Sequence, residues 1–147
     1  MADEGKRSVT LTIGWVMLVI MGALLAVGGV ESLLIAYRGT GPLVAGMSSQ
    51  DLAAVKGELP NALRGRRATA ATLALTSGLL VAWIAAVPFR RGERWSWWAL
   101  LSSVGLGGLG SILRVPMLET RAGAGVAVVF LVWLILALAI SYRDMTR

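Results

Sequence analysis

The stretch "IGWVMLVIMGALLAVGGVESLLIAY", residues 13–37, decides the fold class, because it is apolar almost throughout and carries a single charged residue, Glu31. An α-helix rises ~1.5 Å per residue, so a run of this length crosses the ~30 Å hydrocarbon layer of a membrane with some tilt. The stretch therefore predicts a membrane-spanning helix.

Three more apolar blocks follow, near residues 68–89, 97–117 and 123–142, and each is bounded by charge. Of the 147 residues, 56% are hydrophobic and 15% are charged, which is more apolar than a soluble domain can hide. Strands of a membrane barrel would be about half as long and would alternate in polarity. The sequence predicts an all-α polytopic membrane protein, a four-transmembrane-helix bundle that forms a single membrane domain over residues 1–147.

The first block has two interpretations. Lys6 and Arg7 precede it, and Ala26-Val27-Gly28 offers the small residues of a cleavage site, as in a secretory signal. The apolar run continues through residues 33–36, beyond the length of a signal core. We favour an uncleaved anchor, with the signal peptide as the alternative.

The loop at residues 38–67 is the longest segment outside the blocks, and it predicts a short amphipathic helix at about 49–63. Ser48 or Ser49 is a suitable N-cap, and Asp51 in the first turn is favourable against the helix dipole. We expect Pro60 to bend or break this helix. It either lies at the lipid interface or acts as a lid or partner-docking helix. Its apolar positions recur at helical spacing, at Leu52, Val55, Leu59 and Leu63.

The net charge of +6 arises from basic residues placed where the helices leave the membrane, in "RGRR" (64–67) and "FRRGER" (89–94). Juxtamembrane Lys and Arg attract anionic lipid headgroups, and indole rings anchor at the same depth. We therefore expect contact with a lipid bilayer that includes anionic lipids, and no nucleic acid. The expected interface anchors are Arg90, Arg91, Arg94, Trp95, Trp97 and Trp98.

Three further tryptophans lie within the blocks. Trp15 and Trp83 are expected to join the aromatic belt on the same membrane face as the anchors. Trp133 falls in the middle of its block, so it either fills the core or borders a ligand.

The positive-inside count is nearly balanced between the two sides. The short, dense "FRRGER" is hard to translocate, whereas the longer first loop offsets its bases with Asp51 and Glu58. We expect a multi-pass protein of the cell membrane with both termini in the cytoplasm.

Missing residue types exclude much chemistry. Without cysteine there is no disulfide, iron–sulfur cluster or thiolate metal site, and without histidine the usual haem ligand and catalytic base are lacking. Lys6 and Lys56, the only lysines, lie outside the spans, which excludes a retinal-type Schiff base in the bundle. We expect no catalytic residue, metal or cofactor, and an enzymatic role is disfavoured.

The sequence "GLGGLG" at 105–110 formally contains the dinucleotide-binding pattern GxGxxG. That function requires a preceding strand and a soluble sheet, which are missing here. Small residues in a membrane helix let a neighbouring helix approach closely. We therefore expect Gly105, Gly107, Gly108 and Gly110 to be helix-packing residues. Facing surfaces are available at Gly22, Ala26 and Gly29 in the first helix and at Gly123 and Gly125 in the fourth.

Glu31 and Arg114 are the charged residues inside the predicted spans. Each lies within about five residues of a helix end on the same membrane face, so their depths match. Charges at this depth are costly unless they pair or reach water, and they are functional candidates by default. The two residues either pair or are satisfied separately. With Thr76 and Ser77 of the second helix they form the candidate intramembrane polar site.

The stretch "PFRRGERWSWWAL", residues 88–100, together with "SSQDLAAVKGELPNAL" in the first loop, resembles a group of uncharacterised small prokaryotic four-helix integral membrane proteins. In that group a GERW-aromatic loop joins the second and third helices. The resemblance covers about residues 12–100 and leaves out the glycine-rich third helix with Arg114. It implies a fold and a membrane location, but no reaction, cofactor or catalytic residue.

Three functional hypotheses follow. The first is a small membrane binding or accessory protein, as a subunit of a larger complex or a homo-oligomer. The second is a small transporter or proton-coupled carrier that uses Glu31 and Arg114, and the third is a membrane enzyme without His or Cys chemistry. The sequence identifies no small-molecule ligand.

Overall fold

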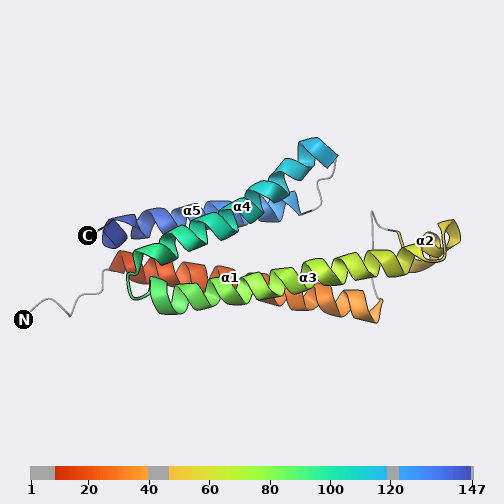
Figure 1. Ribbon diagram of the computed structural model, residues 1–147, viewed down its shortest axis with the longest axis horizontal. Coiled ribbons are helices and arrows are strands. Elements are labelled where there is room, and N and C mark those ends of the chain that lie inside the picture. Colours follow the sequence, from red (N-terminus) through yellow and green to blue (C-terminus); the bar gives the residue numbers. More distant parts are fainter. Residues whose placement is uncertain (1–8, 40–46, 119–122, 147) are drawn as a thin grey trace, which may run out of the picture. The chain divides into compact units, whose positions relative to one another are not determined.

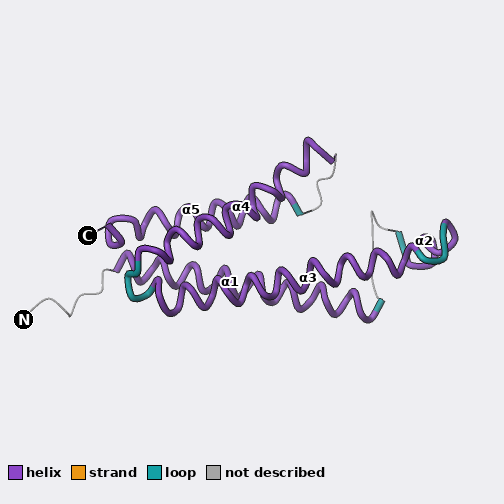
Figure 2. Tube along the Cα trace, in the orientation of Figure 1, coloured by secondary structure: helices purple, strands orange, loops and turns teal. Residues whose placement is uncertain are grey.

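The computed structural model describes residues 9–39, 47–118 and 123–146. The helices follow in the order α1 (Val9–Arg38), α2 (Ser49–Val55), α3 (Leu59–Ile84), the π-helical turn η1 (Ala85–Phe89), α4 (Arg94–Leu118) and α5 (Ala124–Thr146) (Figures 1 and 2). The protein is all-α, as predicted. Lys6 and Arg7, which precede the first apolar block, lie outside the described residues.

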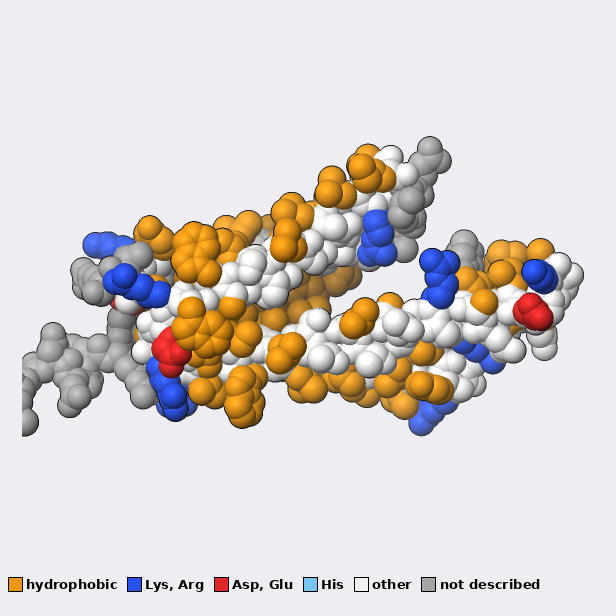
Figure 3. Space-filling model, in the orientation of Figure 1, with side chains coloured by type: hydrophobic (Ala, Val, Ile, Leu, Met, Phe, Trp, Pro, Cys, Tyr) orange, Lys and Arg blue, Asp and Glu red, His pale blue; other side chains and the backbone are white. Residues whose placement is uncertain are grey.

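Four helical segments are long and apolar enough to cross a membrane: Val9–Arg38, Leu59–Phe89, Arg94–Met117 and Ala124–Met145. This confirms the prediction of four membrane-length helices. On the face shown in Figure 3, apolar side chains cover the middle of the long helices, and Lys and Arg side chains lie toward their ends. The second span begins earlier than predicted, at Leu59 instead of near residue 68.

The predicted amphipathic helix at 49–63 is wrong in its extent. α2 ends at Val55, and α3 begins at Leu59, whose N–H donates to the Lys56 carbonyl over 3.0 Å. Pro60 lies in the first turn of α3, where a backbone N–H has no helical acceptor, so the proline is tolerated there. Leu59 and Leu63 consequently belong to the long helix α3.

The segment after α3 reverses the chain within a few residues. Pro88 lies in η1 and supplies no N–H, and the Arg90 N–H bonds to the Ala85 carbonyl over 3.2 Å, which is the wider π-helical spacing. Gly92 then adopts φ +80°, a conformation that favours glycine. Pro88 and Gly92 thus shape the turn between the second span and the third.

The chain packs as two compact units, and both α1 and α3 run through each of them. The first unit contains α1 up to Gly22, α3 from Leu80 with η1, and all of α4 and α5. The second contains residues 23–79, hence the rest of α1, the helix α2 and the first part of α3. The prediction of a single membrane domain is not tested by this division.

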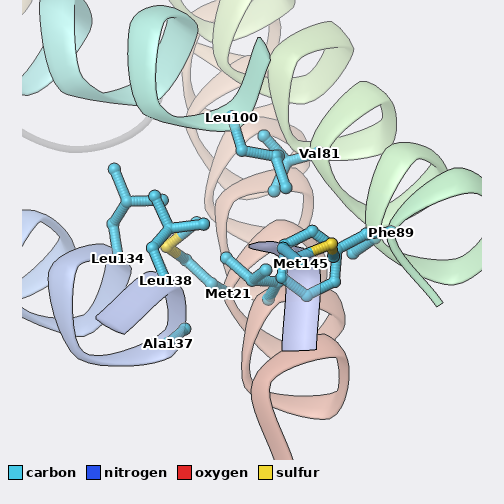
Figure 4. Close-up of a cluster of buried hydrophobic side chains, with 10 residues drawn as sticks. Met21, Val81, Phe89, Leu100, Leu134, Ala137, Leu138 and Met145 are labelled. Carbon is cyan, nitrogen blue, oxygen red and sulfur yellow. The ribbon is translucent and has the colours of Figure 1, made fainter. Parts of the chain in front are cut away.

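The first unit is a four-helix bundle with an apolar core. Met21 of α1, Phe89 of η1, Leu100 of α4 and Leu134 of α5 are completely buried and point toward one another (Figure 4). Leu18 of α1 is also completely buried in this cluster. α4 and α5 pack along each other, as Figure 1 shows. The core thus joins all four long helices within this unit.

Glycine permits the closest helix contacts. In the first unit, a Cβ atom added to Gly14 of α1 would lie 1.8 Å from the Ser141 hydroxyl of α5. In the second unit, a Cβ atom on Gly29 of α1 would lie 2.6 Å from the Leu75 backbone nitrogen of α3. Close backbone approach of this kind is a principal means of joining helices in lipid, where hydrophobic burial gives no driving force.

We expect Gly29→Leu to lower the free energy of unfolding by about 1–3 kcal/mol, because its side chain would overlap the α3 backbone. Gly28→Leu is the matched control, since a Cβ atom there meets nothing within 4 Å. Unfolding of both variants in mixed micelles, followed by circular dichroism, measures the difference. Equal stability of the two variants would contradict the packing of α1 on α3.

Candidate functional site

The four residues of the predicted polar site do not fall in one unit. Glu31, Thr76 and Ser77 belong to the second unit and Arg114 to the first, and all four side chains are exposed. No side-chain hydrogen bond joins Glu31 to another described residue of its unit. Because the placement of the two units relative to each other is not determined, the Glu31–Arg114 pair stays a prediction.

The hydroxyl of Thr76 donates to the Thr72 carbonyl of its own helix over 2.9 Å, and that of Thr72 donates to Ala68 over the same distance. Such bonds satisfy a hydroxyl proton without a partner helix. Thr76 therefore has a local role that requires no ligand.

Among the described residues, no group of three or more acidic side chains gathers that could hold a metal ion.

Only one of the four predicted packing glycines of α4 has a close neighbour. A Cβ atom on Gly108 would lie 2.5 Å from Leu131 of α5, whereas Cβ atoms on Gly105, Gly107 and Gly110 would meet nothing within 4 Å in the described chain. The expected facing surfaces also differ. Gly29 faces α3 in the second unit, and Gly125 has open space around it.

Of the basic and aromatic residues around the start of α4, some bond to α5 and others are exposed. The Trp97 indole donates to the Leu138 carbonyl of α5 over 3.1 Å, and Arg94 Nε donates to the Met145 carbonyl over 2.9 Å. These two residues hold α4 against α5, a role that sequence reasoning missed. Arg91, Trp95 and Trp98 are exposed.

The remaining anchors also make contacts within the first unit. The guanidinium of Arg90 lies 5.2 Å from the centre of the Trp15 ring, a cation–π geometry between η1 and α1. The ring of Trp97 meets Trp98 edge-on, with centroids 4.8 Å apart. The predicted belt residue Trp83 is 68% exposed, as an anchor at the lipid interface requires.

Trp133 serves the core, which was one of the two alternatives for it. Its half-buried indole donates to the Met17 carbonyl of α1 over 3.0 Å, so α5 is tied to α1. The ring also borders an apolar groove of about 350 Å³. The other groove-lining residues are Met17, Val128, Val129, Val132 and Leu136.

A polar groove of about 460 Å³ in the second unit was not foreseen from the sequence. It runs between the end of α1 and the first part of α3. The sequence analysis interpreted "RGRR" as juxtamembrane charge that attracts lipid headgroups. The order of residues alone does not determine which of these arginines faces α1. The groove is lined by Ala36, Tyr37, Arg64, Gly65, Ala68, Thr69 and Thr72.

Arg64 is the charged residue of this groove. Its Nη2 donates to the Ser49 hydroxyl of α2 over 2.9 Å, which ties α3 to the short helix. A Cβ atom on Gly39, which has φ +66°, would lie 2.6 Å from Nη2, so the guanidinium packs against the residue that follows α1. A cation at a helix C-terminus is favoured by the helix dipole.

The start of α2 is a capping box. The Asp51 N–H donates to the Ser48 hydroxyl oxygen over 3.2 Å, and the Ser48 N–H donates to the Asp51 carboxylate over 2.9 Å. The Ser48 hydroxyl donates to the same carboxylate over 2.7 Å. The bond from this hydroxyl, followed by that from the backbone N–H, lowers the pKa of Asp51 from its ordinary value. The prediction of a serine cap with Asp51 in the first turn is confirmed at Ser48.

Comparison of the chain with models of known protein families, with curated proteins and with solved structures found no match. These comparisons do not bear on the resemblance to small prokaryotic four-helix membrane proteins, which stays a prediction. The function must therefore be argued from the geometry of the chain itself.

We expect the α2 cap to weaken at acid pH. A carboxylate with a depressed pKa stabilises the folded state above its unfolded pKa, and that contribution is lost as the pH falls through the lower folded value. The Asp51 bonds should therefore persist at neutral pH and fail well below pH ~4. Hydrogen exchange of the Leu52 amide, measured against pH with Asp51→Asn as the comparison, tests this. A pH profile identical in both proteins would contradict it.

Proposed function

We propose that the protein is a small integral membrane protein that binds a transmembrane helix of another chain, as an accessory subunit or a homo-oligomer. The single observation that supports this is an open face on α4. Of the most apolar window of this helix only 6% is buried, against 22–28% in the other three spans. Within the described chain, α4 thus buries the smallest share of its surface among the four spans.

The open face of α4 consists of small residues at helical spacing. Ser103, Gly107 and Gly110 recur at intervals of four and three residues, so they lie on one side of the helix, and all three are exposed. The Ser103 hydroxyl donates to the Ala99 carbonyl over 2.6 Å, so it needs no outside acceptor. Small residues four apart let a second helix approach closely in lipid.

Another side of α4 already packs within the first unit. Val104 packs against the core of the first unit, and Gly108 meets Leu131 of α5. The open face of Ser103, Gly107 and Gly110 therefore suits a partner without disturbing the intramolecular contact. Arg114 continues the same face, four residues after Gly110.

The proposed location is the cell membrane of a prokaryote, with both termini in the cytoplasm. The exposed Arg90 and Arg91, close to Arg94, form a dense basic turn beside α4, which supports retention of that side in the cytoplasm. The exposed Trp95 and Trp98 suit the adjoining headgroup layer, where anionic lipids attract the arginines.

Native mass spectrometry after gentle extraction tests the proposed function. We expect the wild-type protein to carry a stoichiometric partner chain, identical or different, and Gly107→Leu to reduce its recovery by about tenfold, because the leucine would hold the helices apart. Gly105→Leu is the control, since a Cβ atom there also meets nothing within 4 Å but the residue lies on another side of α4.

A wild-type protein recovered only as a monomer would overturn the proposal. Equal partner recovery in Gly107→Leu and Gly105→Leu would do the same, because the partner would then bind elsewhere.

A further inference from the structure

The polar groove of the second unit has the size and the depth of a headgroup site. Its volume of about 460 Å³ is in the range of small-molecule pockets. The second span covers 31 residues, or about 46 Å, which exceeds the ~30 Å hydrocarbon layer by roughly ten residues. The excess belongs to the polar start of α3, because the apolar run begins only near residue 68. Arg64 and Gly65 thus lie at headgroup depth.

Arg64 presents a donor that no described residue uses. A guanidinium has five N–H groups, and one of those on Nη2 is occupied by Ser49. The Nε atom of Arg64 is buried, and no described residue accepts a hydrogen bond from it. A buried donor without an acceptor is costly. The guanidinium also lines the groove, where its remaining Nη N–H groups can donate to an oxygen anion.

The surroundings of the groove favour an anion. None of its lining residues is acidic, and the exposed Arg66, two residues after Arg64 on the same helix, adds positive charge near the groove. Tyr37, which is 78% exposed at the end of α1, supplies a phenolic hydroxyl on the opposite wall. Arginine in a partly buried site is the usual partner of phosphate oxygens.

We propose that this groove binds a phosphate group, carried by an anionic phospholipid headgroup, with Arg64 as the principal donor. The acyl chains of such a lipid would extend along the exposed apolar residues of α3, among them Leu73. Free inorganic phosphate shares the same chemistry, and the experiment separates the two sources. The proposal is independent of the partner face on α4.

The test uses the full chain in nanodiscs of phosphatidylcholine with a minor fraction of phosphatidylglycerol, released and weighed by native mass spectrometry. We expect the wild-type protein to retain one phosphatidylglycerol. Arg64→Gln should lower this occupancy by about tenfold, the scale of one lost charge-assisted hydrogen bond. Arg66→Gln should lower it by less than about twofold, because this arginine is exposed and outside the lining.

Arg64 also contacts the end of α1, so a second variant keeps the site distinct from folding. Thr69→Leu fills the groove and leaves the guanidinium in place, and it should also lower lipid retention while circular dichroism stays that of the wild type. Excess inorganic phosphate should leave the bound lipid in place. Displacement of the lipid by inorganic phosphate would instead identify a site for the free anion, which overturns the lipid assignment.

Two results would overturn the site itself. One is equal lipid loss in Arg64→Gln and Arg66→Gln, which would mean general surface attraction. The other is full retention in Thr69→Leu, which would place the lipid outside the groove.

Discussion

Hydrogen bonding of the backbone within each helix is the constraint on which the rest of the structure depends. Hydrocarbon offers no partner to an N–H or C=O group, so a chain that crosses it must close these bonds internally. The four membrane-length helices do so, and exposed hydroxyls on them follow the same rule, as Thr72, Thr76 and Ser103 bond to carbonyls of their own helices. The outer surfaces of these helices therefore consist of apolar or small side chains, which can contact lipid or another helix.

Contacts between helices then depend on shape and on a few polar bonds. Gly14 and Gly29 bring backbones together, while Trp97 and Trp133 carry their indole protons to carbonyls of a neighbouring helix. Where α1 ends at Arg38 and α3 continues beyond it, this close packing stops and the polar groove opens. The polar groove thus results from the unequal lengths of α1 and α3.

Much of the fold is predictable because apolarity and length are local properties of the sequence. The extent of the amphipathic helix was not predictable, because Pro60 is compatible with a helix start as well as with a helix break. Local composition does not distinguish these two cases. The positions of Glu31 and Arg114 along their helices are also predictable from the sequence, but such a position does not determine which faces of two helices meet. For the same reason, no sequence pattern indicates that Arg64, among several arginines, lines the groove.

Membrane crossing by the long helices is the central claim, and cysteine accessibility tests it most directly because the chain contains no native cysteine. Single cysteines at Gln50, Leu73 and Arg91 mark the α2 side, the interior and the other end of the second span, and all three sites are exposed. In sealed vesicles, an impermeant maleimide should label the cysteines at positions 50 and 91 from opposite sides and leave position 73 unlabelled until the membrane is dissolved. Labelling of positions 50 and 91 from the same side, or ready labelling at position 73, would contradict the account.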